Sequence, residues 1–353
     1  MAKKVLMKGN EAIAEAAISV GCIHFFGYPI TPQTEVAEYL AKRLPKVGGL
    51  CLQAESEVAA INMTLGAAAA GTRVMTSSSS PGISLKSEGI SYIAGSDLPC
   101  LIVNVQRGGP GLGGIQPSQA DYYQATRGVG HGDLRLIVLA PSSVQEMASL
   151  TAQALDLADI YRMPAMLLAD GALGQMMEPV DFSAFPKRDV PEKTWATVGH
   201  NNARPHNIVN SLYIDPQVLE DSVKARYQRY AEVEKNEVQY EEFMTDDADI
   251  VLVAFGITAR ICKSAVTAAR AAGIKAGLLR PITLWPFPKD AISAAADHAK
   301  ALMSVEMSMG QMVDDVRLAV NGKKPVYFYG RTGGMIPSVE EVTKEICSLA
   351  NAL

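Results

Sequence analysis

The sequence predicts an α/β protein with a mostly parallel, doubly wound sheet and a second, smaller α/β domain. From residue 9 to about residue 170, apolar runs of strand length alternate with helical patterns, which is typical of βαβ units. A polar, proline-containing stretch then interrupts the pattern, and a second alternating block begins at Asp247. At 353 residues the chain exceeds the length at which a single hydrophobic core stops growing, so two domains are expected.

The first block predicts a domain over residues 1–180. Its helices are expected at 10–20, 32–43, 57–70, 82–94 and 143–161, and its strands at 22–27, 50–53, 73–77, 100–106, 134–140 and 165–169. The first and third of these helices end at Gly21 and Gly71. The helix over 32–43 is expected to start with Thr31 as its N-cap and Pro32 as its first residue. Threonine is a good N-cap, and proline has no N–H to lose in the first turn of a helix.

Residues 181–246 are expected to form a linker. Its first part should be extended, because prolines and paired asparagines replace the apolar runs, and a charged helix is expected over 215–242. Such a helix is usually a solvated face or an arm laid over a partner. The second block predicts a domain over 247–353 that starts with a strand over 250–255 and a helix ending at Gly273. Further strands are expected at 275–279, 301–306 and 326–329, and the last helix at the capping box Ser338-Val339-Glu340-Glu341.

Composition excludes several classes of function. A formal charge of −5 gives no reason to expect nucleic acid or a membrane surface as partner. Apolar stretches are too short to span a membrane and no secretory signal is present, so a cytoplasmic protein is expected. No dinucleotide-binding fingerprint, P-loop or nucleophile elbow follows a strand. The five cysteines form no C-x-x-C pair, which excludes an iron–sulfur or zinc site of recognised spacing; they are Cys22, Cys51, Cys100, Cys262 and Cys347.

Four segments at predicted strand ends carry candidate chemistry. The corner Tyr28-Pro29-Ile30-Thr31-Pro32 lies at the carboxyl edge of a parallel sheet, where α/β proteins place ligands. Glu55 and Glu57 precede an alanine-rich helix, where either carboxylate favours the helix dipole or, if it points into a dry pocket, acts in catalysis.

The other two segments combine a cation or hydroxyls with a flexible backbone. In the loop over 104–123, five glycines and two prolines allow close approach to a ligand, and Arg107 either caps the loop or holds a carboxylate bidentately. The run from Thr76 to Gly82 places hydroxyls at a helix start, where they bind an anion or cap the helix.

The order of these motifs resembles the 2-oxoacid:ferredoxin oxidoreductase family over almost the whole chain. The similarity is to the alpha-type subunit, which combines a pyrimidine-binding domain for thiamine diphosphate with a transketolase C-terminal-like domain. The matching segments are "GYPITPQTEV", "ESEVAAINMTLGAAAAG", "TSSSSPGISL", "QRGGPGLGG", "LLRPITLWPFP" and "SVEMSMGQM".

The resemblance implies roles for individual residues. Glu57 matches the glutamate that hydrogen-bonds N1′ of the aminopyrimidine and stabilises its imino tautomer, with Glu55 an ordinary neighbour. Thr31 matches a residue that touches cofactor and substrate, and Arg107 matches the position that pairs with the substrate carboxylate. The residues implied to contact the cofactor are Tyr28, Pro29, Ile30, Thr31, Glu57, Ser78, Ser79, Ser80, Pro81 and Gly82.

The family's G-D-G motif for the diphosphate and Mg²⁺ is missing, since the nearest match, His131-Gly132-Asp133, lacks the second glycine. The resemblance therefore implies that no metal is bound by this chain alone. It implies a partner subunit for the pyrophosphate and Mg²⁺, a ferredoxin-like subunit for the iron–sulfur clusters, and a small gamma-type subunit, with coenzyme A as acyl acceptor.

The substrate expectation comes from the arginine loop. It reads Gly109-Pro110-Gly111-Leu112-Gly113 where 2-oxoglutarate-using members have Ser-Thr-Gly after Gly-Pro, and so it is more similar to the 2-oxoisovalerate type. The alternatives are a 2-oxoglutarate oxidoreductase subunit, a subunit of another thiamine-dependent enzyme, and an α/β assembly subunit without catalytic activity.

Overall fold

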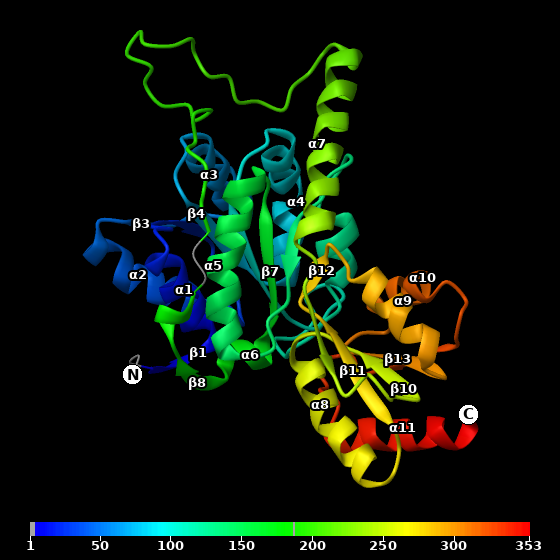
Figure 1. The fold of residues 1–353 in the computed structure, drawn as a ribbon. Helices are drawn as coiled ribbons and strands as arrows, with labels where there is room; N and C mark the ends of the chain where they lie inside the picture. The colour runs from blue at the N-terminus through cyan, green and yellow to red at the C-terminus, as the bar shows by residue number, and fades with distance from the viewer. Residues whose placement is uncertain (1–3, 186–187) are drawn as a thin grey trace.

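A seven-stranded sheet forms the centre of the larger lobe in the computed structural model, which describes residues 4–185 and 188–353 (Figure 1). Six of its strands are parallel, and the edge strand β12 runs antiparallel to β6. In spatial order the strands are β12 (Thr283–Trp285), β6 (Ile137–Leu139), β7 (Ala165–Asp170), β5 (Leu101–Gln106), β4 (Val74–Ser78), β2 (His24–Gly27) and β3 (Leu50–Gln53).

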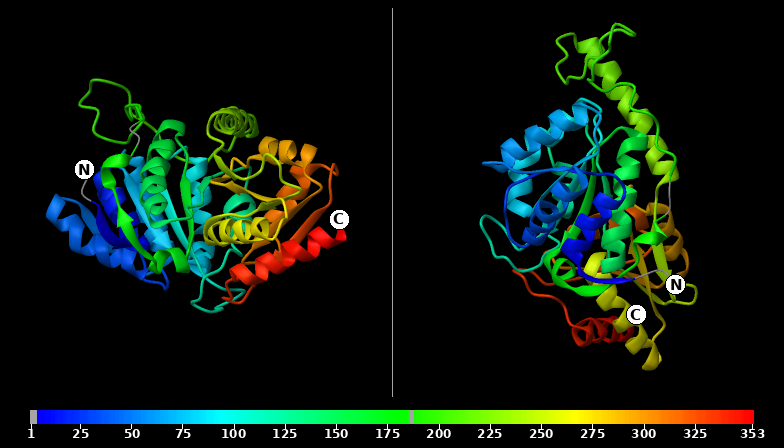
Figure 2. Two further views of the ribbon diagram at one scale, coloured as in Figure 1. Left: turned by 60° about the horizontal axis from the view of Figure 1, so that its bottom comes forward. Right: turned by 90° about the vertical axis from the view of Figure 1, so that its left-hand side faces the viewer.

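Helices cover both faces of this sheet (Figures 1 and 2). On one face α1 (Gly9–Ser19) packs against α2 (Thr34–Arg43) and α5 (Val144–Tyr161). On the other face α3 (Glu57–Ala69) packs against α4 (Ser80–Gly95). Because both faces are covered, the central strands are buried along their whole length, as β4, β5 and β7 show.

The second sheet has five strands and forms the smaller lobe beside the first (Figure 2, left). Three parallel pairings join its central strands, and β9 is an antiparallel edge strand. The order is β14 (Val326–Gly330), β13 (Ala301–Glu306), β10 (Ile250–Val253), β11 (Ala276–Pro281) and β9 (Tyr240–Phe243). Its helices are α8 (Gly256–Ala271), α9 (Lys289–His298), α10 (Met312–Val320) and α11 (Val339–Ala352).

The two mostly parallel sheets, each covered by helices, confirm the predicted α/β class. The capping box of the last helix is also present: the Ser338 hydroxyl accepts from the Glu341 N–H, and the Glu341 carboxylate accepts from the Ser338 N–H. The domain limits at residues 180 and 246 stay a prediction.

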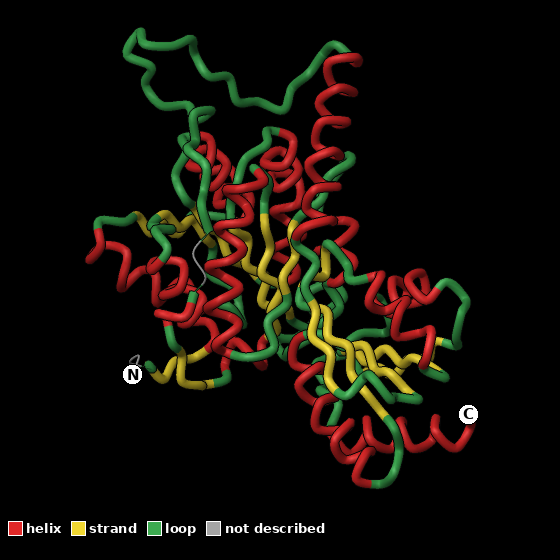
Figure 3. The backbone as a smooth tube through the Cα atoms, viewed as in Figure 1, coloured by secondary structure: helices red, strands yellow, loops and turns green. Residues whose placement is uncertain are grey.

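An irregular segment starts at residue 188, runs along the large lobe with Thr197 N–H donating to Ala69 O, and then forms a loop that projects beyond the sheet and joins α7 (Pro216–Asn236), as Figures 1 and 3 show. The remaining elements are the antiparallel pair β1 (Val5–Lys8) and β8 (Met177–Val180), helix α6 (Gly171–Gln175), and the short turns η1 (Leu44–Val47), η2 (Gln124–Gly128) and η3 (Phe182–Ala184). Within residues 4–185 and 188–353, every helix is too short or too polar to cross a membrane.

The predicted helix start at Thr31 and Pro32 is wrong. Helix α2 begins at Thr34 with Gln33 as N-cap, and the Thr31–Pro32 peptide is cis. Side chains from other elements hold the carbonyls of the corner instead: Asn10 Nδ2 donates to Pro32 O at 2.8 Å and Arg107 Nη1 donates to Thr31 O at 3.0 Å. Because tertiary hydrogen bonds fix these carbonyls, the helix begins only after the corner.

The predicted helix over 215–242 is too long at its C-terminal end. Helix α7 ends at Asn236, and residues 240–243 form strand β9, which pairs with β11. The alternation of exposed and half-buried residues in β9 fits an edge strand better than a helix. Seven further elements of the structure were not predicted: β1, β8, β9, β12, α6, α9 and α10.

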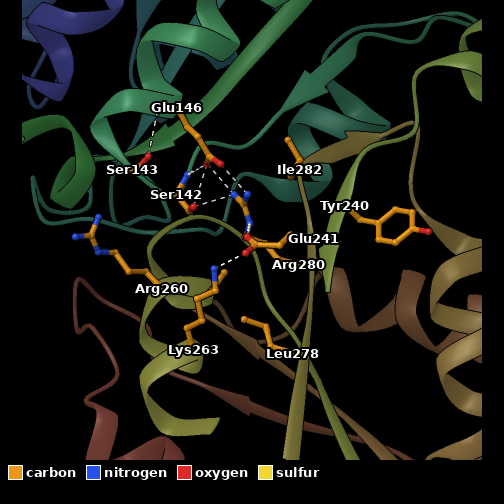
Figure 4. A pocket seen from close by; sticks show the side chains of 11 residues that line it. Ser142, Ser143, Glu146, Tyr240, Glu241, Arg260, Lys263, Leu278, Arg280 and Ile282 are labelled. Atoms are coloured by element: carbon orange, nitrogen blue, oxygen red, sulfur yellow. Dashed lines mark hydrogen bonds and ion pairs between the residues drawn. The ribbon is translucent and has the colours of Figure 1, made fainter. Parts of the chain in front are cut away.

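An ionic cluster joins the two sheets where an open cavity of about 590 Å³ lies between them (Figure 4). Arg280 of β11 has a side chain that is only 5% exposed, and it pairs with Glu146 of α5 at 2.7 Å and with Glu241 of β9 at 2.9 Å. Arg280 also donates to the Ser142 hydroxyl at 2.8 Å. Since Glu146 belongs to the large lobe, this cluster and strand β12 fix the second sheet against the first.

Candidate active site

The candidate site lies where the carboxyl ends of β2 and β4 meet in the large sheet. The chain leaves β2 toward β3 in one direction and leaves β4 toward β5 in the other, so the strand order reverses between them. This reversal is the position at which doubly wound sheets bind ligands. The corner after Gly27, the serine run after Ser78 and the arginine after Gln106 all belong to this edge.

Glu57 is the first residue of α3, and it is buried with 6% of its surface exposed. Ser56 starts the helix, since its hydroxyl accepts from the Ala59 N–H at 3.1 Å. In the described part of the chain no hydrogen bond reaches the Glu57 carboxylate, whereas Glu55 is exposed. The structure therefore distinguishes two glutamates that the sequence leaves equivalent, because Glu57 is buried and Glu55 is exposed.

The first turn of α4 lies directly against Glu57. A Cβ built on Gly82 would lie 2.9 Å from Glu57 Oε1 and 2.0 Å from the Ser78 hydroxyl oxygen. Glycine at this position is therefore what allows the carboxylate, the serine and the helix start to come together.

We expect Gly82→Ala to lower the free energy of unfolding by about 1–3 kcal/mol, because an added methyl group must displace neighbouring atoms in a packed site. Gly66 in α3 is the matched control, since nothing lies within 4 Å of a Cβ built there. There the same substitution should raise stability by about 0.5–1 kcal/mol through helix propensity. Chemical denaturation of both variants measures the difference, and equal effects would contradict the close packing at Gly82.

The three serines of the run differ in their partners. Within the described residues, the buried hydroxyls of Ser78 and Ser79 have no hydrogen-bond partner. The Ser80 hydroxyl accepts from the Arg107 N–H at 3.0 Å and donates to Asp121 at 2.6 Å. Burial raises the pKa of Asp121 against the opposing hydrogen bonds. Ser78 and Ser79 are thus the hydroxyls left for a ligand.

Arg107 connects the corner to the glycine-rich loop from a buried position. Its Nη1 donates to Thr31 O and its Nη2 donates to Leu112 O, both at 3.0 Å, while Nε has no partner in the described chain. A guanidinium carries five N–H donors, so these two bonds leave three for a carboxylate. Thr31 itself is exposed, with Tyr28 and Ile30 half-buried and Pro29 exposed beside it.

Sequence reasoning missed a buried polar layer beneath the corner. The Ser77 hydroxyl donates to Gln33 Oε1 at 2.6 Å, and Gln33 is fully buried. Lys86 of α4 is also fully buried and donates to Thr76 Oγ1 at 2.6 Å. One signal was present in the sequence: Lys86 falls on the stripe of α4 that Ile83 and Ile90 make apolar.

The "SVEMSMGQM" segment builds the adjoining edge of the second sheet. Glu306 ends β13 fully buried, and its carboxylate accepts five hydrogen bonds, three of them from the N–H groups of Gln311, Met312 and Val313 at the start of α10. Gln119, which follows the glycine-rich loop, exchanges hydrogen bonds with Met307. Glu306 is thus a structural cap that fixes this edge beside the loop.

Within residues 4–185 and 188–353, no group of three or more His, Cys, Asp or Glu side chains is arranged to bind a metal ion. All five cysteines are free, and burial raises the pKa of Cys22 and of Cys100 to about 12. Burial therefore favours the protonated, non-nucleophilic form of the Cys22 and Cys100 thiols.

Comparisons with known proteins identify similar chains. The profile of "Pyruvate flavodoxin/ferredoxin oxidoreductase, thiamine diP-bdg" matches residues 15–245, and that of "Pyruvate:ferredoxin oxidoreductase core domain II" matches residues 248–342. The ketoisovalerate oxidoreductase subunit VorB of Methanothermobacter thermautotrophicus is 50% identical over 98% of this chain and 97% of its own length. The 2-oxoglutarate synthase subunit KorA of Methanothermobacter marburgensis is 36% identical over 99% of this chain and 100% of its own length.

A solved structure is similar over nearly the whole chain. The 2-oxoglutarate:ferredoxin oxidoreductase of Magnetococcus marinus, solved with 2-oxoglutarate, coenzyme A and succinyl-CoA bound, superimposes with a TM-score of 0.86 at 28% identity. The similarity covers 98% of this chain and 65% of that longer chain. The two Methanothermobacter relatives are named as subunits, so the relatives of this chain work within multi-subunit enzymes.

Proposed function

The chain belongs to the thiamine diphosphate-binding pyruvate flavodoxin/ferredoxin oxidoreductase family, and we propose that it is a catalytic subunit of a 2-oxoacid:ferredoxin oxidoreductase acting on 2-oxoisovalerate. The reaction would release carbon dioxide, form an acyl-CoA and reduce ferredoxin. The observation that carries the proposal is the Glu57 carboxylate: it is buried, unpaired in the described chain, and packed against Gly82 at the point where the strand order reverses.

The residues at this edge fit the aminopyrimidine half of thiamine diphosphate. A carboxylate can accept a hydrogen bond from a ring nitrogen that carries a proton. The buried hydroxyls of Ser78 and Ser79 have no hydrogen-bond partner among the described residues and are free to bind the ring. The absence of a Cβ at Gly82 lets the first turn of α4 pack directly against Glu57. We propose that Glu57, Ser78, Ser79 and Gly82 hold the pyrimidine, with the corner Tyr28-Pro29-Ile30-Thr31 and Ser80-Pro81 lining its surroundings.

When bound, thiamine diphosphate supplies the electron sink that a 2-oxoacid needs in order to lose carbon dioxide. The part of this chain is to bind and orient. In the proposal, Glu57, which is only 6% exposed, accepts a hydrogen bond from the pyrimidine ring, and this bond is stronger in the low local dielectric than in solution. Arg107 binds the substrate carboxylate through the guanidinium N–H groups that do not already donate to the Thr31 and Leu112 carbonyls.

Partner chains complete the enzyme in this proposal. The sequence contains neither a G-D-G motif nor a C-x-x-C pair, so we assign the pyrophosphate and Mg²⁺ to one partner subunit and the iron–sulfur clusters to a ferredoxin-like one. A small gamma-type subunit and coenzyme A complete the proposed assembly. The subunit names of the relatives support a multi-subunit enzyme.

The substrate proposal rests on the glycine-rich loop and on relatedness. Leu112 and Ile115 are 83% and 58% exposed at the face beside Arg107, which suits an apolar side chain on the substrate. Identity is higher to the ketoisovalerate enzyme subunit than to the 2-oxoglutarate one. The test is to purify the complex and compare 2-oxoisovalerate, pyruvate and 2-oxoglutarate with coenzyme A and a low-potential electron acceptor. A preference for 2-oxoglutarate would overturn the proposed substrate.

We expect Arg107→Ala to raise KM for the 2-oxoacid by about 10–100-fold with a smaller change in kcat, because a hydrogen bond to a charged group contributes about 1.5–3 kcal/mol. Arg107→Lys should recover only part of the loss, since an ammonium does not bind a carboxylate bidentately. Steady-state kinetics of the reconstituted complex measure both variants. An unchanged KM with every 2-oxoacid would remove this assignment.

A further inference from the structure

The stretch of chain that returns from the glycine-rich loop, residues 116–123, lies between the candidate site and the smaller lobe; it is called the return segment below. Its first residues close the loop: the Gly108 N–H donates to Gln116 O at 2.9 Å, and Arg107 forms an antiparallel β-bridge with Pro117. The return segment is therefore tied directly to the backbone that carries the Arg107 side chain. The proposed reaction gives it no role so far.

Asp121 connects the return segment to the candidate site. Its carboxylate accepts from the Ser80 hydroxyl at 2.6 Å and from Asn104 Nδ2 at 2.9 Å, and its N–H donates to Gln106 Oε1 at 3.1 Å. The same Ser80 hydroxyl accepts from the Arg107 N–H at 3.0 Å. Asp121 thus holds the Arg107 backbone through Ser80, in addition to the bridge at the base of the loop.

Gln119 connects the return segment to the smaller lobe from a fully buried position. Its Nε2 donates to Phe255 O at 2.8 Å, its Oε1 accepts from the Met307 N–H at 3.1 Å, and its own N–H donates to Met307 O at 2.9 Å. Phe255 is the N-cap of α8 and Met307 follows β13, so one side chain binds two corners of the second sheet. A Cβ built on Gly256 would lie 2.9 Å from Gln119 Nε2, so glycine allows this close approach.

Two further contacts join the smaller lobe to the return segment. Gln311 Nε2 donates to Ala120 O at 2.7 Å, and Gln311 Oε1 accepts from the Tyr123 N–H at 2.8 Å. A Cβ built on Gly334 would lie 2.3 Å from Gln116 Cβ, so the turn after β14 packs on the start of the segment. The smaller lobe therefore contacts the return segment at its start, its middle and its end.

We propose that Gln119 is a positioning residue for Arg107, which fixes the return segment to the smaller lobe and so holds the base of the glycine-rich loop in the geometry that binds the substrate carboxylate. The inference rests on the proposed role of Arg107. It goes beyond that role, because it makes substrate binding depend on a residue that touches neither substrate nor cofactor. It also gives the smaller lobe a part in recognising the substrate.

The first test is the kinetics of Gln119→Met in the reconstituted complex. Methionine has a similar length but no amide, so the Phe255 carbonyl and the Met307 N–H lose their partner and the return segment is no longer fixed. KM for the 2-oxoacid should rise by about 5–10-fold with a smaller change in kcat, because a displaced guanidinium keeps its charge but loses its bidentate geometry. An unchanged KM would overturn the proposal.

Two comparisons distinguish positioning from a general weakening of the junction between the lobes. The side chain of Arg280 donates to Ser142, Glu146 and Glu241 at this junction, away from the return segment, so Arg280→Met should leave KM within about 2-fold. The second comparison is the double variant of Gln119→Met with Arg107→Ala. If Gln119 acts through Arg107, its replacement should add less than about 2-fold to the KM of Arg107→Ala. Effects on KM that multiply in full would overturn the proposal.

The last test needs no turnover. In the assembled complex without substrate, hydrogen exchange over residues 104–118 should be faster in Gln119→Met than in the unmodified chain, because the bonds at the base of the loop open more often. Unchanged exchange there would overturn the proposal even if Arg107 binds the substrate. Faster exchange together with an unchanged KM for Arg107→Ala would instead refute the proposed role of Arg107. If Gln119→Met does not assemble, Gln311→Met, which removes the other side-chain bonds to the return segment, decides both tests with the same expected direction.

Discussion

In a complex reconstituted with the Glu57→Gln chain, we expect turnover of 2-oxoisovalerate to fall by about 10²–10⁴-fold, the contribution that a positioned acid–base group makes to a rate. Glutamine has nearly the same shape, so the packing against Gly82 is retained and the subunits should still assemble. The amide still offers an oxygen, but it carries no charge with which to stabilise a protonated ring nitrogen. Steady-state assays together with gel filtration of the complex measure both outcomes.

Glu55→Gln is the matched control, because Glu55 lies two residues earlier but is exposed. It should retain near-full turnover. Thiamine diphosphate binding, followed by calorimetry, separates loss of affinity from loss of chemistry in the Glu57 variant. If Glu57→Gln left the activity of the complex nearly intact, the chain would be an assembly subunit whose catalytic residues lie elsewhere.

Local sequence patterns predicted most of the parallel sheet, because buried strands and amphipathic helices leave the periodicities that hydrophobic burial requires. Strand β3 begins and ends where expected, and α3 differs by one residue. The elements that were missed depend on distant partners. Strand β12 is three residues long and exists because it pairs with β6, about 145 positions earlier in the chain. No local pattern reports such a pairing.

The candidate site, too, could be predicted from local sequence patterns only in part. Strand-end position picked out Glu55 and Glu57, Arg107 and the serine run as candidates, since the carboxyl ends of parallel strands share one edge, and only the family resemblance chose Glu57 over Glu55. The start of α2 was wrong because Asn10 and Arg107, far away in sequence, bind the carbonyls of the corner. The pairing of Ser80 with Asp121, and of Ser77 with Gln33, likewise joins separate loops. Hydrogen bonds of this kind are set by the tertiary fold.

We expect Arg280→Met to lower the free energy of unfolding by about 3 kcal/mol. Removing one partner of a buried ion pair costs about 3–5 kcal/mol. The lower end applies because Glu146 and Glu241 keep 27% and 35% of their side chains exposed. Chemical denaturation of the full chain measures the loss. Lys263→Met removes the other cation on Glu241, but Lys263 is 40% exposed, so a cost below about 1 kcal/mol is expected there.

The effect of Arg280→Met should also depend on pH, with a sign that Glu146 determines. Burial alone would raise the pKa of Glu146, but the hydrogen bonds and charge of Arg280, with help from Ser142, outweigh burial and lower it below the ordinary value of 4.5. A carboxyl with a lowered pKa stabilises the fold above its unfolded pKa and loses that contribution as pH falls through the folded value. The difference between the unmodified chain and Arg280→Met should therefore be largest near neutral pH and shrink below about pH 4.5. A difference that stays constant from neutral pH to below pH 4.5 would show that Arg280 stabilises the junction of the two sheets by packing and not by its charge.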